Sequence, residues 1–153
     1  MAESLQDRFG PETICFGCGP ANRDGLQIKS YPEGTEVIAE FLPSSHHRAF
    51  PGAINGGVIG TLLDCHMNWT AAWHFMQQRE DDRPPVTVTS EFSVRLRLVT
   101  PPDTPLHLTA HVVGSVEGRA DVEATVEAAG DVTALGTGTF VAVEEGHPAF
   151  HRW

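Results

Sequence analysis

Asp64 is the residue of this sequence best placed to do chemistry, because it is the single acidic residue in the mostly apolar stretch from Phe50 to Met76. A carboxylate beside Leu62, Leu63 and Cys65 is costly to bury unless it is paired or used. Loss of solvation would raise the pKa of the carboxyl and make its anion a better base. The pattern therefore favours a general base or a nucleophile at this position.

The tripeptide Asn55-Gly56-Gly57 could supply the second half of such a reaction. The first N–H groups of a helix lack intrahelical partners, and two glycines let a ligand approach them. Together with the positive end of the helix dipole, these amides suit a developing oxyanion. A plainer interpretation also stays open, in which Asn55 only caps the helix and Asp64 is a hydrogen-bonded core residue.

The apolar residues of this stretch recur at offsets of three and four, which predicts a long helix. The main stripe consists of Val58, Leu62, Cys65, Trp69, Ala72, Trp73 and Met76, and a second set, Ile59, Leu63, His66 and Thr70, widens it. So broad an apolar surface predicts that most of the helix is buried against other elements. The remaining strip is small or polar and comprises Gly57, Gly60, Thr61, Asp64, Asn68 and Ala71. A close approach by another group is expected along that strip.

The segment from Gly52 to Val58, together with Leu62-Leu63-Asp64, resembles the His-Gly-Gly…Asp signature of hotdog-fold acyl-CoA thioesterases, in the branch that includes the phenylacetate-pathway enzyme. This resemblance implies an α+β hotdog fold, with one long central helix wrapped by an antiparallel sheet and with sites at a dimer interface. It also implies that the Gly57 amide holds the thioester carbonyl and that Asp64 acts as general base or nucleophile. Asn55 stands where His is commoner in the family, and its carboxamide could still hydrogen-bond a substrate.

Strands are predicted at 35–42, 86–99, 106–116, 120–129 and 132–143 from their alternation and from the turn residues between them. Alternation over 86–99 places Phe92 and Val94 on an apolar face and Thr89 on the opposite, polar face. The family resemblance, which covers about residues 35–143, implies that a Ser or Thr of this strand reaches the site from the partner subunit and orients the attacking water. That role falls on Thr89.

The chain is expected to form one hotdog domain at 35–143, preceded by an arm and a Cys-containing loop at 1–34 and followed by a tail at 144–153. The pair Cys15-x-x-Cys18 supplies half of a tetrahedral zinc site. The sequence holds no second such pair, and His46-His47 or Cys65-His66 could complete a site only through a tertiary contact. No metal is therefore expected, and the loop is predicted to cap the core.

The acidic composition limits the partners of the protein. A formal charge of −10 and a pI near 5.1 argue against nucleic acid or an anionic membrane as the main partner. CoA phosphates need only a local basic cluster, for which the candidates are His46, His47, Arg48, Arg95 and Arg97. Further substrate contacts are expected at Gly56, Thr61 and Asn68. The absence of a signal peptide and the odd number of cysteines predict a reducing cytoplasm.

Hydrolysis of acyl-CoA thioesters to free acid and CoA is the favoured function, with Gly57, Asp64 and Thr89 in the roles given above and with no cofactor. The alternative is a non-catalytic acyl-CoA-binding or regulatory hotdog domain, which Asn55 in place of His supports. An enoyl-CoA hydratase of the same fold would need a His where Trp69 stands. A homodimer is expected, and a dimer of dimers fits the same sequence.

Overall fold

A long helix, α2, runs from Gly56 to Arg79 in the computed structural model, which describes residues 2–153 of the chain. Asn55 caps its first turn, and its apolar stripes are enclosed, since Leu62 and Phe75 are fully buried. The predicted helix is confirmed, and it extends past Met76 to Arg79. Across residues 2–153, no helix combines the length and the apolar character needed to cross a membrane.

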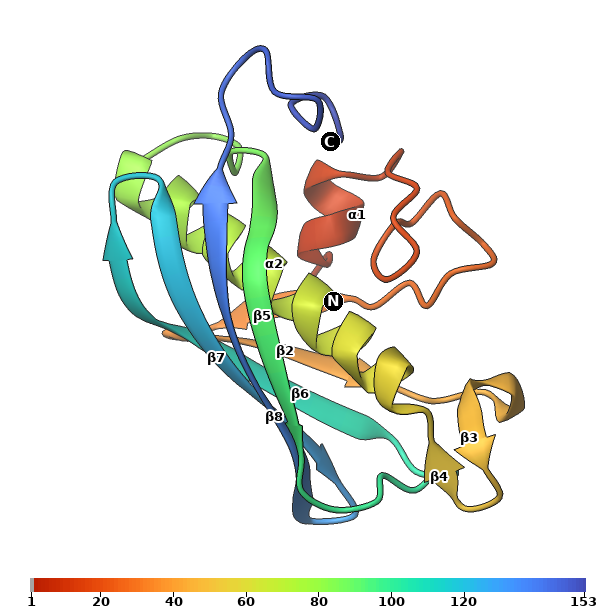
Figure 1. The fold of residues 1–153 in the computed structure, drawn as a ribbon. Coiled ribbons are helices and arrows are strands. Elements are labelled where there is room, and N and C mark those ends of the chain that lie inside the picture. The colour runs from red at the N-terminus through yellow and green to blue at the C-terminus, as the bar shows by residue number, and fades with distance from the viewer. Residues whose placement is uncertain (1) are drawn as a thin grey trace.

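Six antiparallel strands form the sheet that wraps α2, in the order β1-β2-β6-β7-β8-β5. Their bounds are Ser30–Glu33 (β1), Glu36–Phe41 (β2), Thr87–Leu96 (β5), Leu106–Val116 (β6), Arg119–Ala128 (β7) and Asp131–Ala142 (β8). Figure 1 shows the sheet curving round the helix, so the predicted α+β hotdog fold is confirmed. The helix approaches β8 so closely that a Cβ at Gly136 would lie 3.2 Å from the side chains of Leu63 and Met67.

Several short elements were not predicted. β1 joins the sheet at Ser30, ahead of the strand predicted from Thr35. Strands β3 (Arg48–Phe50) and β4 (Ala53–Ile54) form a hairpin before α2, a 3-10 turn at Ser45–His47 precedes that hairpin, and helix α1 spans Leu5–Phe9. Elements of two to five residues carry too few apolar repeats to reveal a period.

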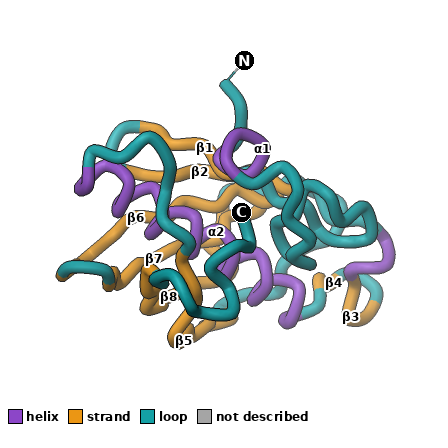
Figure 2. Tube along the Cα trace, turned by 90° about the horizontal axis from the view of Figure 1, so that it is seen from above, coloured by secondary structure: helices purple, strands orange, loops and turns teal. Residues whose placement is uncertain are grey.

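The N-terminal segment covers the side of α2 that faces away from the sheet. Leu5, Phe9 and Ile28 of this segment are buried in the same core as the helix. Figure 2 shows α2 between the strands and the N-terminal loops. The segment therefore packs over the core, and Met1 of the predicted 1–34 arm lies outside the described residues.

The C-terminal tail returns to the same side of the molecule. The Trp153 ring stacks on the Trp69 ring of α2, with centroids 4.4 Å apart. Gly10, just after α1, lies against both tryptophans, since a Cβ there would be 3.0 Å from the Cβ of Trp153 and 3.5 Å from the Trp69 ring. The two ends of the chain thus meet over the central helix.

Candidate active site

The Asp64 carboxylate of α2 is half-buried, and its Oδ1 accepts a hydrogen bond of 2.6 Å from the Thr89 hydroxyl of β5. Burial raises the pKa of the Asp64 carboxyl above its ordinary value, the Thr89 hydrogen bond lowers it, nearby Cys15 raises it and Arg152 lowers it. Within residues 2–153 no hydrogen bond is made to Oδ2. One carboxylate oxygen is therefore held in place while the other is free to accept a proton from water.

Thr89 lies on the face of β5 that packs on the helix, so its predicted place on the face opposite Phe92 and Val94 is wrong. β5 pairs with β8 as Thr89↔Phe140 and then Glu91↔Thr139, which leaves Ser90 as a bulge. A bulge adds one residue to one strand and inverts the alternation beyond it. Thr89 therefore shares a face with Val94 and reaches Asp64 of its own chain.

The start of α2 carries free amides beside a side-chain cap. Asn55 Oδ1 accepts a 3.1 Å hydrogen bond from the Val58 N–H, so the interpretation of Asn55 as an N-cap is confirmed. The N–H groups of Gly56 and Gly57 find no partner within the described chain. Gly57 is exposed, and a Cβ there would lie 2.9 Å from the capping oxygen of Asn55. Two donors thus remain open to a ligand at the positive end of the helix.

Thr61 lies between the helix start and the carboxylate, half-buried on the same strip. Its hydroxyl donates a 2.9 Å hydrogen bond to the Gly57 carbonyl. Because seven residues separate Gly57 from Asp64, their main-chain atoms lie about 10 Å apart along the helix axis. The amide and the carboxylate are therefore on one strip but are not adjacent.

Asn68 is the next residue along this strip, and it is closed off from solvent at 3% exposure. Its Oδ1 has no hydrogen-bond partner within residues 2–153. Arg95 is placed differently, because it lies across from Leu135 on the sheet face away from α2. The structure thus brings the predicted residues Gly57, Thr61 and Asp64 onto one accessible strip, but it does not bring Arg95 to that strip.

His47 and Arg48 lie beside the start of the helix. The Asn55 N–H donates a 2.9 Å hydrogen bond to the His47 carbonyl, and Arg48 pairs with Ile54 across the β3–β4 hairpin. A cavity of about 370 Å³ opens next to this hairpin, lined by residues that include Phe50, Ile54, Gly56, Leu96, Arg97 and Leu98. The helix start therefore borders an apolar cavity with basic side chains near it.

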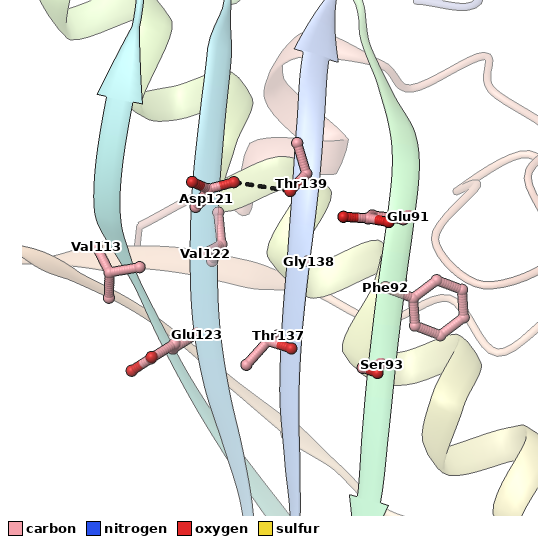
Figure 3. A pocket seen from close by; sticks show the side chains of 10 residues that line it. All are labelled: Glu91, Phe92, Ser93, Val113, Asp121, Val122, Glu123, Thr137, Gly138 and Thr139. Atoms are coloured by element: carbon pink, nitrogen blue, oxygen red, sulfur yellow. Dashed lines mark hydrogen bonds between the residues drawn. The ribbon is translucent and has the colours of Figure 1, made fainter.

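A second hollow of about 300 Å³ lies on the outer face of the sheet. Figure 3 shows Glu91, Asp121 and Glu123 around it, with the Thr139 hydroxyl donating a 2.7 Å hydrogen bond to Asp121. Three carboxylates make this hollow unsuitable for the phosphates of CoA. The cavity at the helix start is the better match to such a ligand.

Some residues near Asp64 were not identified from the sequence. Arg152 of the tail lies close enough to lower the pKa of the Asp64 carboxyl, and its guanidinium donates a 3.5 Å hydrogen bond to the Thr87 carbonyl. The sequence holds no signal for where this tail docks. Cys65 of α2 joins Cys15 and Cys18, and the three sulfurs lie within 4.8 Å of one another, close enough to share a metal ion. The sequence places Cys65 next to Asp64, but it does not show that Cys65 lies beside Cys15 and Cys18 in the fold.

The chain matches no family model and no curated protein sequence. Solved structures do match it. A thioesterase superfamily protein from Shewanella loihica PV-4 is 28% identical, with a TM-score of 0.65 over 82% of this chain and 98% of that one. The PaaI protein of E. coli, from the phenylacetic acid degradation operon, is 12% identical, with a TM-score of 0.66 over 78% of this chain and 81% of that one.

The protein smu.793 of Streptococcus mutans UA159, solved with acetyl-CoA bound, is 18% identical, with a TM-score of 0.61 over 76% of this chain and 88% of that one. These similarities agree with the hotdog architecture described above. The 28% identical protein from Shewanella loihica also confirms the resemblance to the thioesterase superfamily that the Gly-Gly…Asp motif predicts.

Proposed function

We propose that this protein hydrolyses acyl-CoA thioesters to a free acid and CoA. The observation that carries the proposal is the half-buried Asp64 carboxylate, held at Oδ1 by the Thr89 hydroxyl at 2.6 Å, on a helix strip that begins with unpartnered amides. Similarity to a thioesterase superfamily protein supports the reaction class, and the acetyl-CoA bound to another similar protein supports the substrate class.

In this mechanism the Gly57 amide, with the Gly56 amide beside it, donates to the thioester oxygen and stabilises the negative charge that develops there. Asp64 takes a proton from water, whose oxygen attacks the carbonyl carbon, and the proton is then passed to the departing CoA sulfur. Direct attack by Asp64 would instead give an anhydride that water cleaves to the same products.

Thr89 takes a role in this proposal that differs from the one the resemblance implies. Its hydroxyl proton is engaged by Asp64 Oδ1 of the same chain. It therefore positions the carboxylate directly, and it orients water only through that group. Asn55 keeps its Nδ2 donors for the substrate, because only its Oδ1 is used by the cap.

A homodimer belongs to the proposal, because one chain does not place both halves of the site around a single carbonyl. The Gly57 amide and Asp64 lie about 10 Å apart along the axis, whereas a water bridging base and carbonyl spans about 6 Å as two hydrogen-bond lengths. A second copy, whose helix start faces the Asp64 of the first, would close that gap.

The edge strand β5 is the surface proposed for this dimer. It pairs only with β8, so its other edge is open within the described chain. Large apolar side chains are exposed on it and just after it, namely Phe92 at 44%, Leu96 at 55%, Leu98 at 53% and Val99 at 63%. Open edges with apolar side chains pair readily with another strand.

The test is release of CoA thiol from short, medium, long and aromatic acyl-CoAs, with the Asp64→Asn variant run alongside. Turnover that depends on Asp64 would support the proposal and begin to define the acyl group. If acyl-CoA raises the melting temperature of the folded protein but is not hydrolysed, the protein is a binding domain instead. The N-cap formed by Asn55 favours the binding domain, because capping explains Asn55 without a catalytic role.

We also place the protein in the cytoplasm as part of the proposal, because none of its three cysteines is in a disulfide. Cell fractionation of the untagged protein, followed by thiol labelling in each fraction, checks this. Recovery outside the cytoplasm with oxidised cysteines would contradict it.

A further inference from the structure

Three cysteine sulfurs converge beside the proposed active site, and the hydrolysis described above uses none of them. Cys15 and Cys18 come from the N-terminal loop and Cys65 from α2, and all three sulfurs lie within 4.8 Å of one another. We propose that these residues form a three-thiolate site for a zinc ion. The ion would tie the N-terminal loop to the central helix. The proposal stands independently of thioester hydrolysis.

The spacing of the sulfurs fits tetrahedral zinc. With a Zn–S bond of about 2.3 Å, two thiolates on one tetrahedral ion lie about 3.8 Å apart. The sulfurs of Cys15 and Cys65 are 3.7 Å apart. Three thiolates leave one position, which a water molecule can take on the side where Cys15 is half-exposed.

The loop is built to lie close to Cys65. A Cβ at Gly17 would overlap the Cys65 sulfur and would come within 2.8 Å of the Thr61 methyl group. Backbone hydrogen bonds hold the loop in this position, from Gly19 N–H to the Cys15 carbonyl at 2.8 Å and from Ile28 N–H to the Gly17 carbonyl at 3.1 Å. The sulfurs are thus held together by the backbone, as a preformed metal site requires.

A buried indole N–H lies on the same helix face as Cys65. Trp69 follows Cys65 by four residues on α2, so the two side chains share one face of the helix. Trp69 is 1% exposed, and its Nε1 has no hydrogen-bond partner within residues 2–153. An N–H group without an oxygen acceptor is free to donate to a nearby thiolate, and outer donors of this kind support metal ligands.

The expected absence of metal rested on the lack of further ligands for the Cys-x-x-Cys pair, and the fold supplies Cys65. The neighbouring His66 does not join the cluster, because its two ring nitrogens contact the Ser30 hydroxyl at 2.8 Å and the Val37 carbonyl at 2.9 Å. The alternative is a disulfide between two of the three cysteines. A disulfide would not explain why the third sulfur lies in the same cluster.

Titration of the reduced, metal-free protein with Co²⁺ tests the proposal. We expect one Co²⁺ per chain, with an ultraviolet sulfur-to-cobalt charge-transfer band and the visible bands of a tetrahedral ion. One equivalent of Zn²⁺ should displace the cobalt. Cys65→Ser and Cys15→Ser should each lose the stoichiometric site. Asp24→Asn, on the same loop and exposed, is the matched control and should bind metal as the parent does.

Gly17→Ala separates geometry from ligand number. It keeps all three thiols but pushes the loop away from Cys65, so we expect metal affinity to fall at least about tenfold, as when a group supporting a metal ligand is removed. Failure of the parent protein to bind either metal while three thiols titrate as free would overturn the proposal. So would loss of two thiols to a disulfide, seen by mass under non-reducing conditions, in protein that binds no metal after reduction.

Discussion

The Thr89 hydroxyl of strand β5 donates a 2.6 Å hydrogen bond to Oδ1 of Asp64 on helix α2, within one chain. The contact exists because Ser90 is a bulge between the paired residues Thr89 and Glu91, and the bulge turns Thr89 toward the helix. The hydroxyl fixes one carboxylate oxygen and leaves the other free. This hydrogen bond predicts how substitutions of Thr89 and of Asp64 should each change turnover.

Replacing the Thr89 hydroxyl should lower turnover without unfolding the protein. A hydrogen bond to a charged group contributes about 1.5–3 kcal/mol, so Thr89→Val should reduce kcat by about tenfold to a hundredfold. Thr89→Ser keeps the hydroxyl and is the matched control. Steady-state kinetics on the best acyl-CoA separate kcat from KM, and equal kcat values for the two variants would remove Thr89 from the mechanism.

Removal of the Asp64 charge should have the larger effect on activity. Asp64→Asn keeps the size of the side chain but cannot take a proton, so turnover should fall at least about a hundredfold, the scale of a positioned base. The melting temperature should not fall, because the substitution removes the cost of burying a charge. An unchanged turnover in the folded variant would show that the carboxylate is structural.

Two substitutions at Asn55 should separate its cap from its substrate contact. Asn55→Ala removes the capping oxygen and should lower the free energy of unfolding by about 1 kcal/mol. Asn55→Asp keeps an acceptor for the Val58 N–H but places a negative charge beside the amides that serve the oxyanion. It should therefore keep stability and lose activity. Urea unfolding and kinetics on both variants check this, and full activity in Asn55→Asp would limit Asn55 to capping.

A charge on the open edge of β5 should break the proposed dimer. Phe92→Glu places a carboxylate among exposed apolar side chains, so it should give a monomer in sedimentation together with a loss of turnover. Val116→Glu is the control, because Val116 is also exposed, at 67%, but lies at the end of β6. A parent protein that sediments as a fully active monomer would contradict the shared site.

Stability should depend on the protonation of His66. This ring is fully buried, and burial lowers its pKa from 6.5 to about 4. Because Val37 offers a carbonyl, Nε2 of His66 carries the proton, and Nδ1 accepts from the Ser30 hydroxyl. The neutral ring is thus the form that the fold holds.

The unfolded chain binds this proton more readily, so the free energy of unfolding should fall as pH drops from 6.5 toward 4. The fall is about 3 kcal/mol at about 1.4 kcal/mol per pKa unit. His66→Gln cannot titrate and should show a smaller decline over the same range. Urea unfolding at several pH values measures both slopes, and parallel slopes would exclude His66 as the cause.

The parts of the site that lie on one helix could be predicted from the sequence. The 3.6-residue period relates Gly57, Thr61 and Asp64 without any knowledge of the sheet, and the cap at Asn55 is likewise local. The proximity of Cys65 to Cys15 depends on how a loop folds back over the helix, and nothing in the local pattern encodes it.

The strand errors have a similar physical origin. Alternation over 86–99 was correctly taken as a strand, but a bulge has no reliable sequence signal, so every face assignment before Ser90 was inverted relative to those after it. β1 was missed because Ser30–Glu33 is stabilised by pairing with β2 rather than by an apolar pattern of its own.

The bulge at Ser90 also bears on how relatives of this chain should be compared. Loss of that one residue would restore regular pairing along β5 and turn either Thr89 or the later apolar residues away from the helix. A one-position gap in an alignment at this point would therefore mark the loss or transfer of the hydroxyl that supports Asp64. Two sequences could share the Gly-Gly…Asp motif in full and still differ in this support because of a single deletion.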